Sequence, residues 1–434
     1  MTHAWRLAAR RLLAAVALST APLGAQPLDA PQDTPPPATL PAPTDSAAIA
    51  RGETHEVSLL TMAWGEEIWA RFGHNAIRVR DRRSGFDMSY NWGMFDFDQP
   101  NFLSRFLTGD TKYWMAAFPS TPMLEAYARQ GRAVREQRLD LRAGERGALL
   151  AFLEWNALEP NRYYRYDYYR DNCSTRVRDA LDRVLGGALA RALDPIATTG
   201  TWRSHTERLT AGVPLAYAGI SIALGRNADR PLSTWQEAFL PVRFARALDS
   251  LRITRADGTA ARLVTEAQVL VPATRPAEPE VAPRWSWWKS LATAAIVWLA
   301  VWLVARGRGI GAALTGVWYL LCGVLGTALF LAGTVTKHVP YMGTNASLLL
   351  VNPLHLVLAV LVPLAVWRLA RGESALIVWT RRLAIVSAVL AMASPLAFAA
   401  LGQSVLPVGA LGPLHLIGPV ALGVGRRRSP PTRA

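Results

Sequence analysis

Long apolar stretches and short alternating patterns divide the chain into two kinds of region. Beyond residue 286, apolar residues form five spans, each close to the ~20 residues that cross a hydrocarbon core. The spans cover residues 289–305, 310–332, 347–367, 383–401 and 405–424, the last interrupted by prolines and glycines. Residues 55–271 carry shorter strand and helix patterns instead. We therefore predict a folded domain followed by an α-helical membrane domain of about five transmembrane helices.

The folded region mixes both types of secondary structure. Alternating apolar and polar positions predict strands over 57–62, 75–80, 88–92 and 136–141. Helical periodicity predicts helices over 121–130 and 143–157, and a third from Cys173 until Gly186 and Gly187 end it. We expect an α+β domain in which Cys173 lies at a helix start.

The charge distribution argues against a nucleic-acid binder. The 434 residues are 51% hydrophobic and 18% charged, with a net charge of +15 and a mean hydropathy of +0.14. This composition excludes an intrinsically disordered protein. The basic excess lies in residues 1–25 and 286–434, beside apolar segments, where it orients a protein in a bilayer, and residues 26–285 are nearly neutral. We predict a membrane partner and no nucleic acid.

The N-terminus is typical of an exported protein. Basic residues precede an apolar run, and small residues then lead to Ala25, which predicts a cleaved signal peptide; an uncleaved anchor is the alternative. We expect ordered structure to begin near Glu56. We divide the chain into a signal peptide (1–25), a Pro/Ala-rich linker (26–54), the folded domain (55–271), a second linker (272–285), the membrane helices (286–424) and a basic cytoplasmic tail (425–434).

The basic residues between the spans alternate in a way that fits an exported domain. If residues 26–285 are outside, the loops that contain Arg306, Arg368 and Arg428 are inside, as the positive-inside rule requires. An odd number of spans agrees with this arrangement. We predict a multi-pass protein of the bacterial inner membrane with a periplasmic domain. A soluble bundle of buried helices is the alternative, and spans of this length disfavour it.

The two cysteines lie in different regions. Cys322 falls in the second apolar span and cannot easily reach Cys173 in the exported domain. We therefore predict that Cys173 is an unpaired thiol in an oxidising compartment. A helix start lowers the pKa of a thiol, which favours a nucleophile. The alternative is an inert cysteine that packs as a small buried hydrophobe.

A cysteine nucleophile needs a base, and the exported region contains three histidines, His55, His74 and His205. His74 follows a glycine at the start of a predicted strand, which suits an imidazole that projects into a cleft. We prefer His74 as the base. A third polar group holds the imidazole tautomer in sites of this kind. Asn91, on the next strand, is the first choice for that group and Tyr90 is the second.

Several motifs together resemble the Lnb-type periplasmic domain, a family named for a lipoprotein N-acyltransferase. They are FGHNAIRV (72–79), YNWGMFDF (90–97), NRY (161–163) and YYRDNCSTR (168–176). The family resembles circularly permuted NlpC-type papain-like folds, including lecithin:retinol acyltransferase, in which histidine precedes cysteine as it does here. The resemblance covers about residues 55–250 and implies a permuted papain-like α+β fold.

The resemblance also implies Cys173 as the nucleophile and His74 as the base of an acyltransferase. Such an enzyme takes an acyl chain from a phospholipid donor, holds it as a thioester and passes it to the N-terminal amine of a lipoprotein acceptor. The backbone N–H of Cys173 is the nearest donor to the oxyanion, with Asn172 and Tyr168 as side-chain candidates. We expect no metal and no cofactor, because the sequence shows no closely spaced ligand set.

The resemblance extends into the membrane region and draws attention to His338 and Asn345. The charge-derived topology puts His338 in the outer loop between the second and third spans. Both side chains are candidates for binding a lipid headgroup or lining the path of the acyl chain, and ordinary interfacial polar residues are the alternative. Two other functions stay open: a cysteine amidopeptidase or lipid hydrolase of the cell envelope, and a noncatalytic envelope scaffold.

Overall fold

The chain divides into two units, which we call the sheet unit and the helical unit. The computed structural model describes residues 40–282, 308–403, 412 and 414–422, with single positions between 288 and 299. Among the described residues, the sheet unit contains 40–217 and 230–282, and the helical unit contains 218–229 and those from 288 onward. Ala218–Asp229, which lies within the predicted folded domain of 55–271, belongs to the helical unit.

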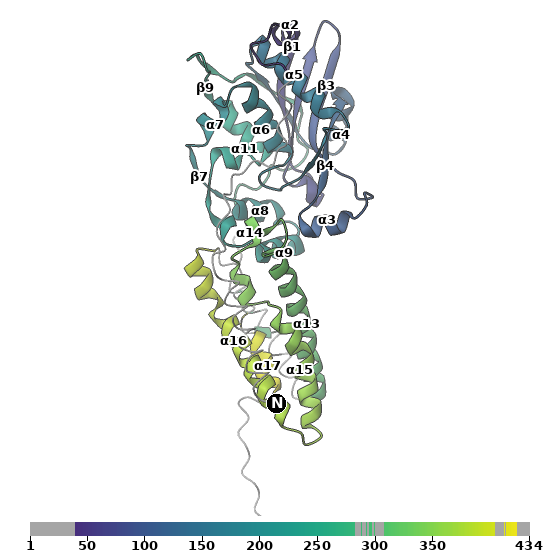
Figure 1. Cartoon of the computed structure of the whole chain (residues 1–434), viewed down its shortest axis with the longest axis vertical. Coiled ribbons are helices and arrows are strands. Elements are labelled where there is room, and N and C mark those ends of the chain that lie inside the picture. Colours follow the sequence, from purple (N-terminus) through teal and green to yellow (C-terminus); the bar gives the residue numbers. More distant parts are fainter. Residues whose placement is uncertain are drawn as a thin grey trace, which may run out of the picture. The chain divides into compact units, whose positions relative to one another are not determined.

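The sheet unit is built on an antiparallel sheet that has seven strands among the described residues (Figure 1). The strand order is β11-β5-β1-β2-β3-β4-β6. The strands are β1 (His55–Met62), β2 (His74–Asp81), β3 (Phe86–Met94), β4 (Lys112–Pro119), β5 (Val134–Leu139), β6 (Tyr163–Arg165) and β11 (Val264–Val271). Two small antiparallel pairs accompany it, β7 (Ala197–Thr201) with β8 (Pro231–Ser233) and β9 (Arg252–Thr254) with β10 (Ala260–Arg262).

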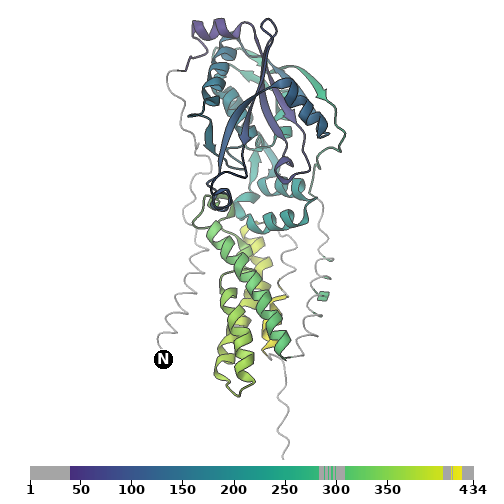
Figure 2. The ribbon, with the colours of Figure 1, turned by 90° about the vertical axis from the view of Figure 1, so that its right-hand side faces the viewer.

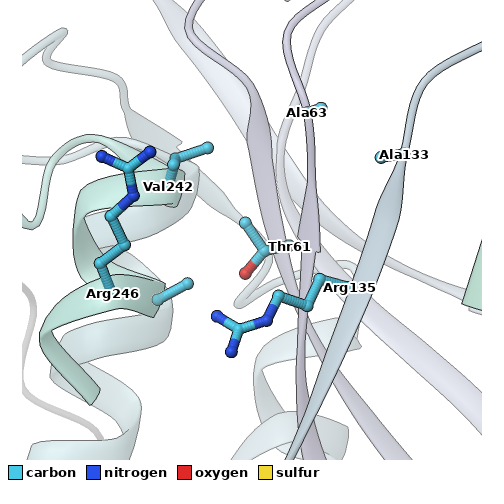
Figure 3. A pocket seen from close by; sticks show the side chains of 7 residues that line it. Thr61, Ala63, Ala133, Arg135, Val242 and Arg246 are labelled. Atoms are coloured by element: carbon cyan, nitrogen blue, oxygen red, sulfur yellow. The ribbon is translucent and has the colours of Figure 1, made fainter. Parts of the chain in front are cut away.

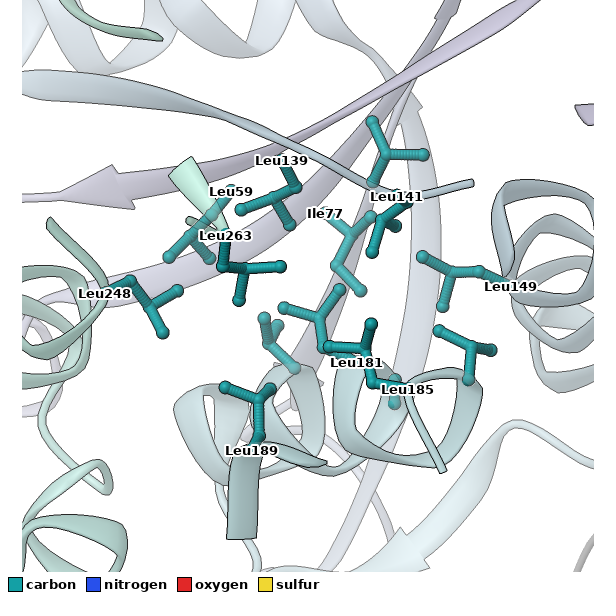
Figure 4. Close-up of a cluster of buried hydrophobic side chains, with 14 of the residues drawn as sticks. Leu59, Ile77, Leu139, Leu141, Leu149, Leu181, Leu185, Leu189, Leu248 and Leu263 are labelled. Atoms are coloured by element: carbon teal, nitrogen blue, oxygen red, sulfur yellow. The ribbon is translucent and has the colours of Figure 1, made fainter. Parts of the chain in front are cut away.

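Helices cover both faces of this sheet. Successive residues of a strand point to opposite faces, so each strand contributes side chains to two cores. Leu59 belongs to the larger core, and Leu60 to a smaller core on the other face. The larger core packs against α5 (Ala143–Ala157), α6 (Cys173–Val184), α7 (Ala188–Leu193) and α11 (Pro241–Asp249), and Figure 4 shows its leucines. The smaller core packs against α4 (Ser120–Arg129).

The remaining elements of the sheet unit are short, apart from one helix that passes into the other unit. They are α2 (Ser46–Gly52), η1 (Ile68–Ala70), α3 (Phe102–Thr108), α8 (Trp202–Thr210) and α10 (Thr234–Glu237). Helix α9 (Pro214–Ala223) begins in the sheet unit, and its end and η2 (Arg226–Asp229) belong to the helical unit.

The predicted strands and helices of this domain are all present, and α5 has the predicted bounds. Strands β4, β6 and β11 were not predicted. In β11 the side chains of 265–269 are exposed, so this edge strand lacks a buried, alternating face. Ordered structure also begins earlier than the expected Glu56. Helix α2 precedes that residue and packs on α5 through small residues. A Cβ atom on Gly147 would come within 1.9 Å of the Ala48 carbonyl oxygen.

The helical unit contains helices that are long and apolar enough to cross a membrane. Three are found in the described part of the chain, over Gly309–Ala332, Ala346–Leu369 and Ala375–Leu401. Besides the end of α9 and η2, its described elements are α13 (Arg308–Ala332), α14 (Val339–Met342), η3 (Ala346–Leu349), α15 (Leu354–Leu369), α16 (Ala375–Leu401) and α17 (Ile417–Ala421). Helix α15 packs against both α13 and α16, and Figure 2 shows these helices side by side.

Three of the five predicted spans are thus confirmed as helices long enough to cross a membrane. The predicted total of five transmembrane helices is not confirmed. The first predicted span, 289–305, lies outside the described residues except for single positions. The fifth, 405–424, is described only from 412, where α17 is too short to cross a membrane. Helix α16 begins before the predicted residue 383 and contains Arg381 and Arg382. Because arginines near a helix end can extend to the interface, these charges did not mark a loop.

Candidate active site

His74 opens β2 at the end of the sheet where β1 stops. It pairs with Met62, the last residue of β1. The preceding residue, Gly73, has a φ of +78°, and a Cβ atom there would come within 2.9 Å of the Met62 carbonyl oxygen. Only glycine enters the strand in this way without strain. The glycine before the histidine therefore fixes where the imidazole leaves the backbone.

Asn91 holds the His74 ring. Its Oδ1 lies 3.0 Å from His74 Nε2, and its Nδ2 donates to the Ser89 carbonyl oxygen at 2.9 Å. The second bond makes Oδ1 the atom that faces the ring, so Nε2 carries a hydrogen and donates it to Oδ1. In that tautomer Nδ1 has a free lone pair and can accept a proton. Tyr90, the second choice for this role, is buried in the larger core instead.

Cys173 is the first residue of α6, as the sequence predicted. Asn172 caps the helix, with its Oδ1 2.9 Å from the backbone N–H groups of Ser174 and Thr175. Its Nδ2 donates to the carbonyl oxygens of Tyr168 and Phe239, each at 2.9 Å. The whole amide is occupied by these protein partners. Asn172 therefore positions Cys173, and it would have to give up these bonds to bind an oxyanion.

A bulge in β3 makes room for the cysteine beside β2. The regular pairing of β2 with β3 ends at Ala76 and Asn91, and Gly93 follows with a φ of +92°. A Cβ atom on Gly93 would lie 3.4 Å from the Cβ of Cys173. The backbone N–H of Asn75, next to His74, acts to lower the pKa of the Cys173 thiol. The structure thus brings Cys173 to the strands that carry His74 and Asn91.

Burial sets the charge state of both groups. It raises the pKa of the Cys173 thiol to about 11, although the N–H groups of Asn75, Ser174 and Cys173 itself act to lower it. We expected the helix start to lower this pKa, and desolvation outweighs that effect. Burial also lowers the pKa of His74 to about 4, against the bond to Asn91, which raises it. The resting pair is therefore a neutral thiol and a neutral imidazole.

The other two exported histidines are held elsewhere. His55 pairs with Asp81, at the opposite end of β1 from Met62, and its Nδ1 lies 2.7 Å from the Arg51 carbonyl oxygen. His205 is buried, with Nε2 2.8 Å from a Glu237 carboxylate oxygen. Its Nδ1 accepts from Arg208 Nε at 3.0 Å. Both rings have structural partners, which leaves His74 as the candidate base.

Tyrosines line the approach to Cys173. Tyr166 stacks on Tyr113 with ring centroids 4.3 Å apart, and its ring lies 3.8 Å from the position of a Cβ on Gly93. Tyr168 meets the edge of Tyr166 at 5.9 Å between centroids. Burial raises the pKa of each of these phenols, so all are neutral donors. Tyr168 is half-buried in this aromatic wall.

His338 and Asn345, the candidates for lipid binding, belong to the helical unit. Asn345 Nδ2 donates to the carbonyl oxygens of Ile222 and Ala223, and its Oδ1 accepts from Ser347 and Gln403. Both polar atoms of this side chain thus have protein partners, and Nδ2 fastens the end of α9. A headgroup would have to displace these protein partners. His338 is buried at the N-cap of α14.

Sequence reasoning missed Arg132, which lies near this site between α4 and β5. It is buried, and its charge acts on both Cys173 and His74. No pattern distinguishes it in the sequence from the other arginines of the chain. No group of three or more His, Cys, Asp or Glu that could hold a metal ion occurs among the described residues.

A pocket of about 180 Å³ lies on the other side of the same strand ends, against α11 (Figure 3). Its walls include Thr61, Ala63, Arg135 and Arg246. Both arginines are paired, Arg135 with Asp249 and Arg246 with Glu280. The pocket therefore offers no free charge to a ligand, and Cys173 is not part of its lining.

Part of the chain is similar to a known domain family. Residues 46–208 match the Lnb N-terminal periplasmic domain. The resemblance to the Lnb-type domain is thereby confirmed over these residues, which include His74, Asn91 and Cys173. The permuted papain-like fold stays a prediction. Neither the curated proteins nor the solved structures contain a match to the chain. The matched domain and the apolar helices together fit a membrane protein with a periplasmic domain.

Proposed function

We propose that this protein is an acyltransferase of the bacterial inner membrane that crosses the bilayer several times. It would move an acyl chain from a phospholipid, through a thioester on Cys173, to the N-terminal amine of a lipoprotein. The observation that carries the proposal is that Cys173, at the start of α6, lies against β3, the strand whose Asn91 holds the His74 ring at 3.0 Å. The Lnb domain and the apolar helices support a lipid substrate.

The first half-reaction forms the thioester. His74 Nδ1 takes the thiol proton as the Cys173 sulfur attacks the ester carbonyl carbon, because a thiol of pKa about 11 is not ionised beforehand. The carbon–sulfur bond forms and the carbonyl electron pair moves to oxygen. The backbone N–H of Cys173 is a donor for that oxyanion. Collapse expels the lysophospholipid alkoxide, which takes the proton from His74.

The second half-reaction returns the thiol. The lipoprotein amine attacks the thioester carbonyl, and His74 removes a proton from the nitrogen. Collapse of the intermediate breaks the carbon–sulfur bond, and the thiolate regains its proton from His74. The products are an amide and the free enzyme. A membrane anchor increases the effective concentration of both lipid substrates at the site.

Labelled substrates test the proposal directly. The full-length protein is incubated in nanodiscs with a phospholipid that carries a ¹³C-labelled acyl chain and with a synthetic diacylglyceryl-cysteine peptide. Mass spectrometry should detect the labelled amide, lysophospholipid and a labelled Cys173 peptide. Cys173→Ser should abolish all three, while the circular dichroism spectrum stays that of the wild type, because the volume change is small.

Other products would change the assignment. Labelled free fatty acid without amide would make the protein a lipid hydrolase. Turnover of a cell-wall peptide alone would make it an amidopeptidase. A Cys173→Ser variant with wild-type activity would refute the cysteine mechanism.

A further inference from the structure

Arg132 is fixed at the end of the sheet that carries His74. It is 6% exposed, and its Nε donates to the carbonyl oxygen of Ala63 at 2.8 Å. Ala63 directly follows Met62, the partner of His74 in β1. The guanidinium also lies over the Tyr127 ring, 4.7 Å from its centroid. These contacts hold the plane of the guanidinium in one orientation.

One nitrogen of this guanidinium lacks a hydrogen-bond partner among the described residues. Nη1 is 3.4 Å from the Gln130 side-chain oxygen, but Nη2 is buried and has no hydrogen-bond partner in the part of the chain that the structure describes. No ion pair of Arg132 with a carboxylate occurs there either. The buried Arg78, in contrast, is paired with both Asp87 and Glu136. Because an unpaired buried charge is strongly unfavourable, a fixed cation of this kind indicates a place for an anionic ligand.

The charge of Arg132 acts on the candidate catalytic pair. Burial lowers the pKa of Arg132, and the groups that raise it are Tyr127 and Cys173. In return, beside the larger effects of burial, Arg132 lowers the pKa of both Cys173 and His74. The bond to Ala63, the residue after the partner of His74, places the guanidinium at the strand end that carries the imidazole.

We propose that Arg132 Nη2 binds an anionic oxygen of the substrate beside Cys173. The identity of that oxygen rests on the proposed function and has two sources. It is either a phosphodiester oxygen of the lipid donor or the oxyanion that forms when sulfur adds to the ester carbonyl. Either one accepts a charge-assisted hydrogen bond from Nη2.

The first experiment measures anion binding at Cys173 without any enzymatic turnover. Full-length protein is alkylated with iodoacetate, which is anionic, or with iodoacetamide, which is neutral, and the Cys173 peptide is quantified by mass spectrometry. Both reagents attack the thiolate, so the ratio of their rates cancels the thiolate fraction. Arg132→Gln should lower the iodoacetate-to-iodoacetamide ratio by about five- to tenfold, as expected when a nearby opposite charge is removed.

Arg129→Gln is the matched control. Arg129 lies three residues earlier, its side chain is 71% exposed, and its loss changes the net charge equally. It should leave the ratio unchanged. An unchanged ratio in Arg132→Gln as well would overturn the proposal, whether or not the protein transfers acyl chains.

The second experiment distinguishes the two sources of the anionic oxygen. Arg132→Gln is assayed with a short-chain neutral ester and with a short-chain phosphatidylcholine. A rise in KM confined to the phosphatidylcholine would assign Nη2 to the phosphate. A fall in kcat of about tenfold or more with both substrates would assign it to the oxyanion. Wild-type kinetics with both substrates would contradict a role in the reaction.

Two further measurements guard against a variant that fails to fold. Arg132→Lys keeps the charge and should retain most of the iodoacetate preference. In the wild-type protein, dimethyl phosphate should slow alkylation of Cys173 in a saturable manner, and it should not do so in Arg132→Gln or Arg132→Lys if the fixed Nη2 geometry is required. No protection of the wild-type thiol at any concentration would contradict a phosphate site.

Discussion

His74 and Cys173 are both neutral at pH 7, because burial disfavours the charged form of each group. A base and a thiol in this state exchange a proton during attack, rather than resting as an ion pair. The bond from His74 Nε2 to Asn91 is what keeps Nδ1 available for that proton. The chemistry at the residue scale therefore depends on one tautomer.

The first prediction at this scale concerns pH. His74 has a pKa lowered from 6.5 to about 4, and the base form exists above it. With a soluble ester, kcat/KM should stay constant from neutral pH to near pH 5 and fall as the imidazole protonates at about pH 4. An acid limb near pH 6.5 would contradict the assignment of His74 as this base.

Loss of activity at low pH can also come from unfolding, so this profile needs a control for the folded state. An unfolded histidine binds its proton at higher pH than His74 does, so His74 makes folding less favourable as the pH falls below 6.5. Circular dichroism at each pH separates unfolding from loss of the base. Activity values count only where the spectrum is that of the native protein.

A second prediction separates His74 from His338. His74→Ala should lose most of the ~10²–10⁴-fold that general acid–base catalysis supplies, with soluble and lipid esters alike. His338→Ala should impair only lipid substrates, because that residue belongs to the helical unit and would act on headgroup placement. Kinetics with a short-chain soluble ester decide between them. Equal loss in both variants would make His338 part of the catalytic machinery.

At the scale of elements, α6 and the β3 bulge position the nucleophile. The cap at Asn172 fixes the first turn of α6, and Gly93 leaves the space that Cys173 occupies. A side chain at Gly93 would press on the cysteine and would require a backbone conformation with positive φ that favours glycine. The site is thus formed where a helix start meets an irregular strand.

The third prediction tests the cap. Asn172→Ala removes the cap bonds from the backbone of Ser174 and Thr175 and both bonds that Nδ2 donates, so it should lower the free energy of unfolding by about 1–3 kcal/mol and slow thioester formation. Thr201→Ala removes the cap of α8 and is the matched control. It should lower stability by about 1 kcal/mol with little effect on rate. Urea unfolding and pre-steady-state acylation measure the two effects, and equal rate losses would show that the cap has no specific role.

At the scale of the whole molecule, the chain combines an Lnb domain with apolar helices of membrane-spanning length. The sequence did not predict where the segment Ala218–Asp229 belongs. Its flanking residues lie in the sheet unit, but the segment itself is held within the helical unit. Gln403 and Asn345 both bind its carbonyl groups. The chain therefore passes into the helical unit after Tyr217 and returns to the sheet unit after Asp229.

The fourth prediction concerns topology. With the Lnb domain in the periplasm, a reporter fused after Ser404 should be periplasmic, and one fused after Arg428 should be cytoplasmic, as the positive-inside rule requires. Paired alkaline phosphatase and fluorescent-protein fusions report the two sides. If both fusions lie on one side, residues 405–424 do not cross the membrane.

The sequence by itself determined the features that depend on local pattern. The period of apolar residues predicted α5 and the core strands, the length of apolar runs predicted the helices α13 and α15, and the motifs around His74 and Cys173 identified the Lnb domain. The glycine before His74 and the helix start at Cys173 were also visible. Each of these signals lies within a few neighbouring residues.

Only the tertiary structure decided which groups meet and how strongly each is desolvated. It brought Asn91 rather than Tyr90 to the His74 ring, engaged both amide atoms of Asn172, and left one nitrogen of Arg132 without a partner among the described residues. It also reversed the expected shift of the Cys173 pKa. These outcomes depend on burial and on contacts between distant segments, and local sequence patterns carry no information about either.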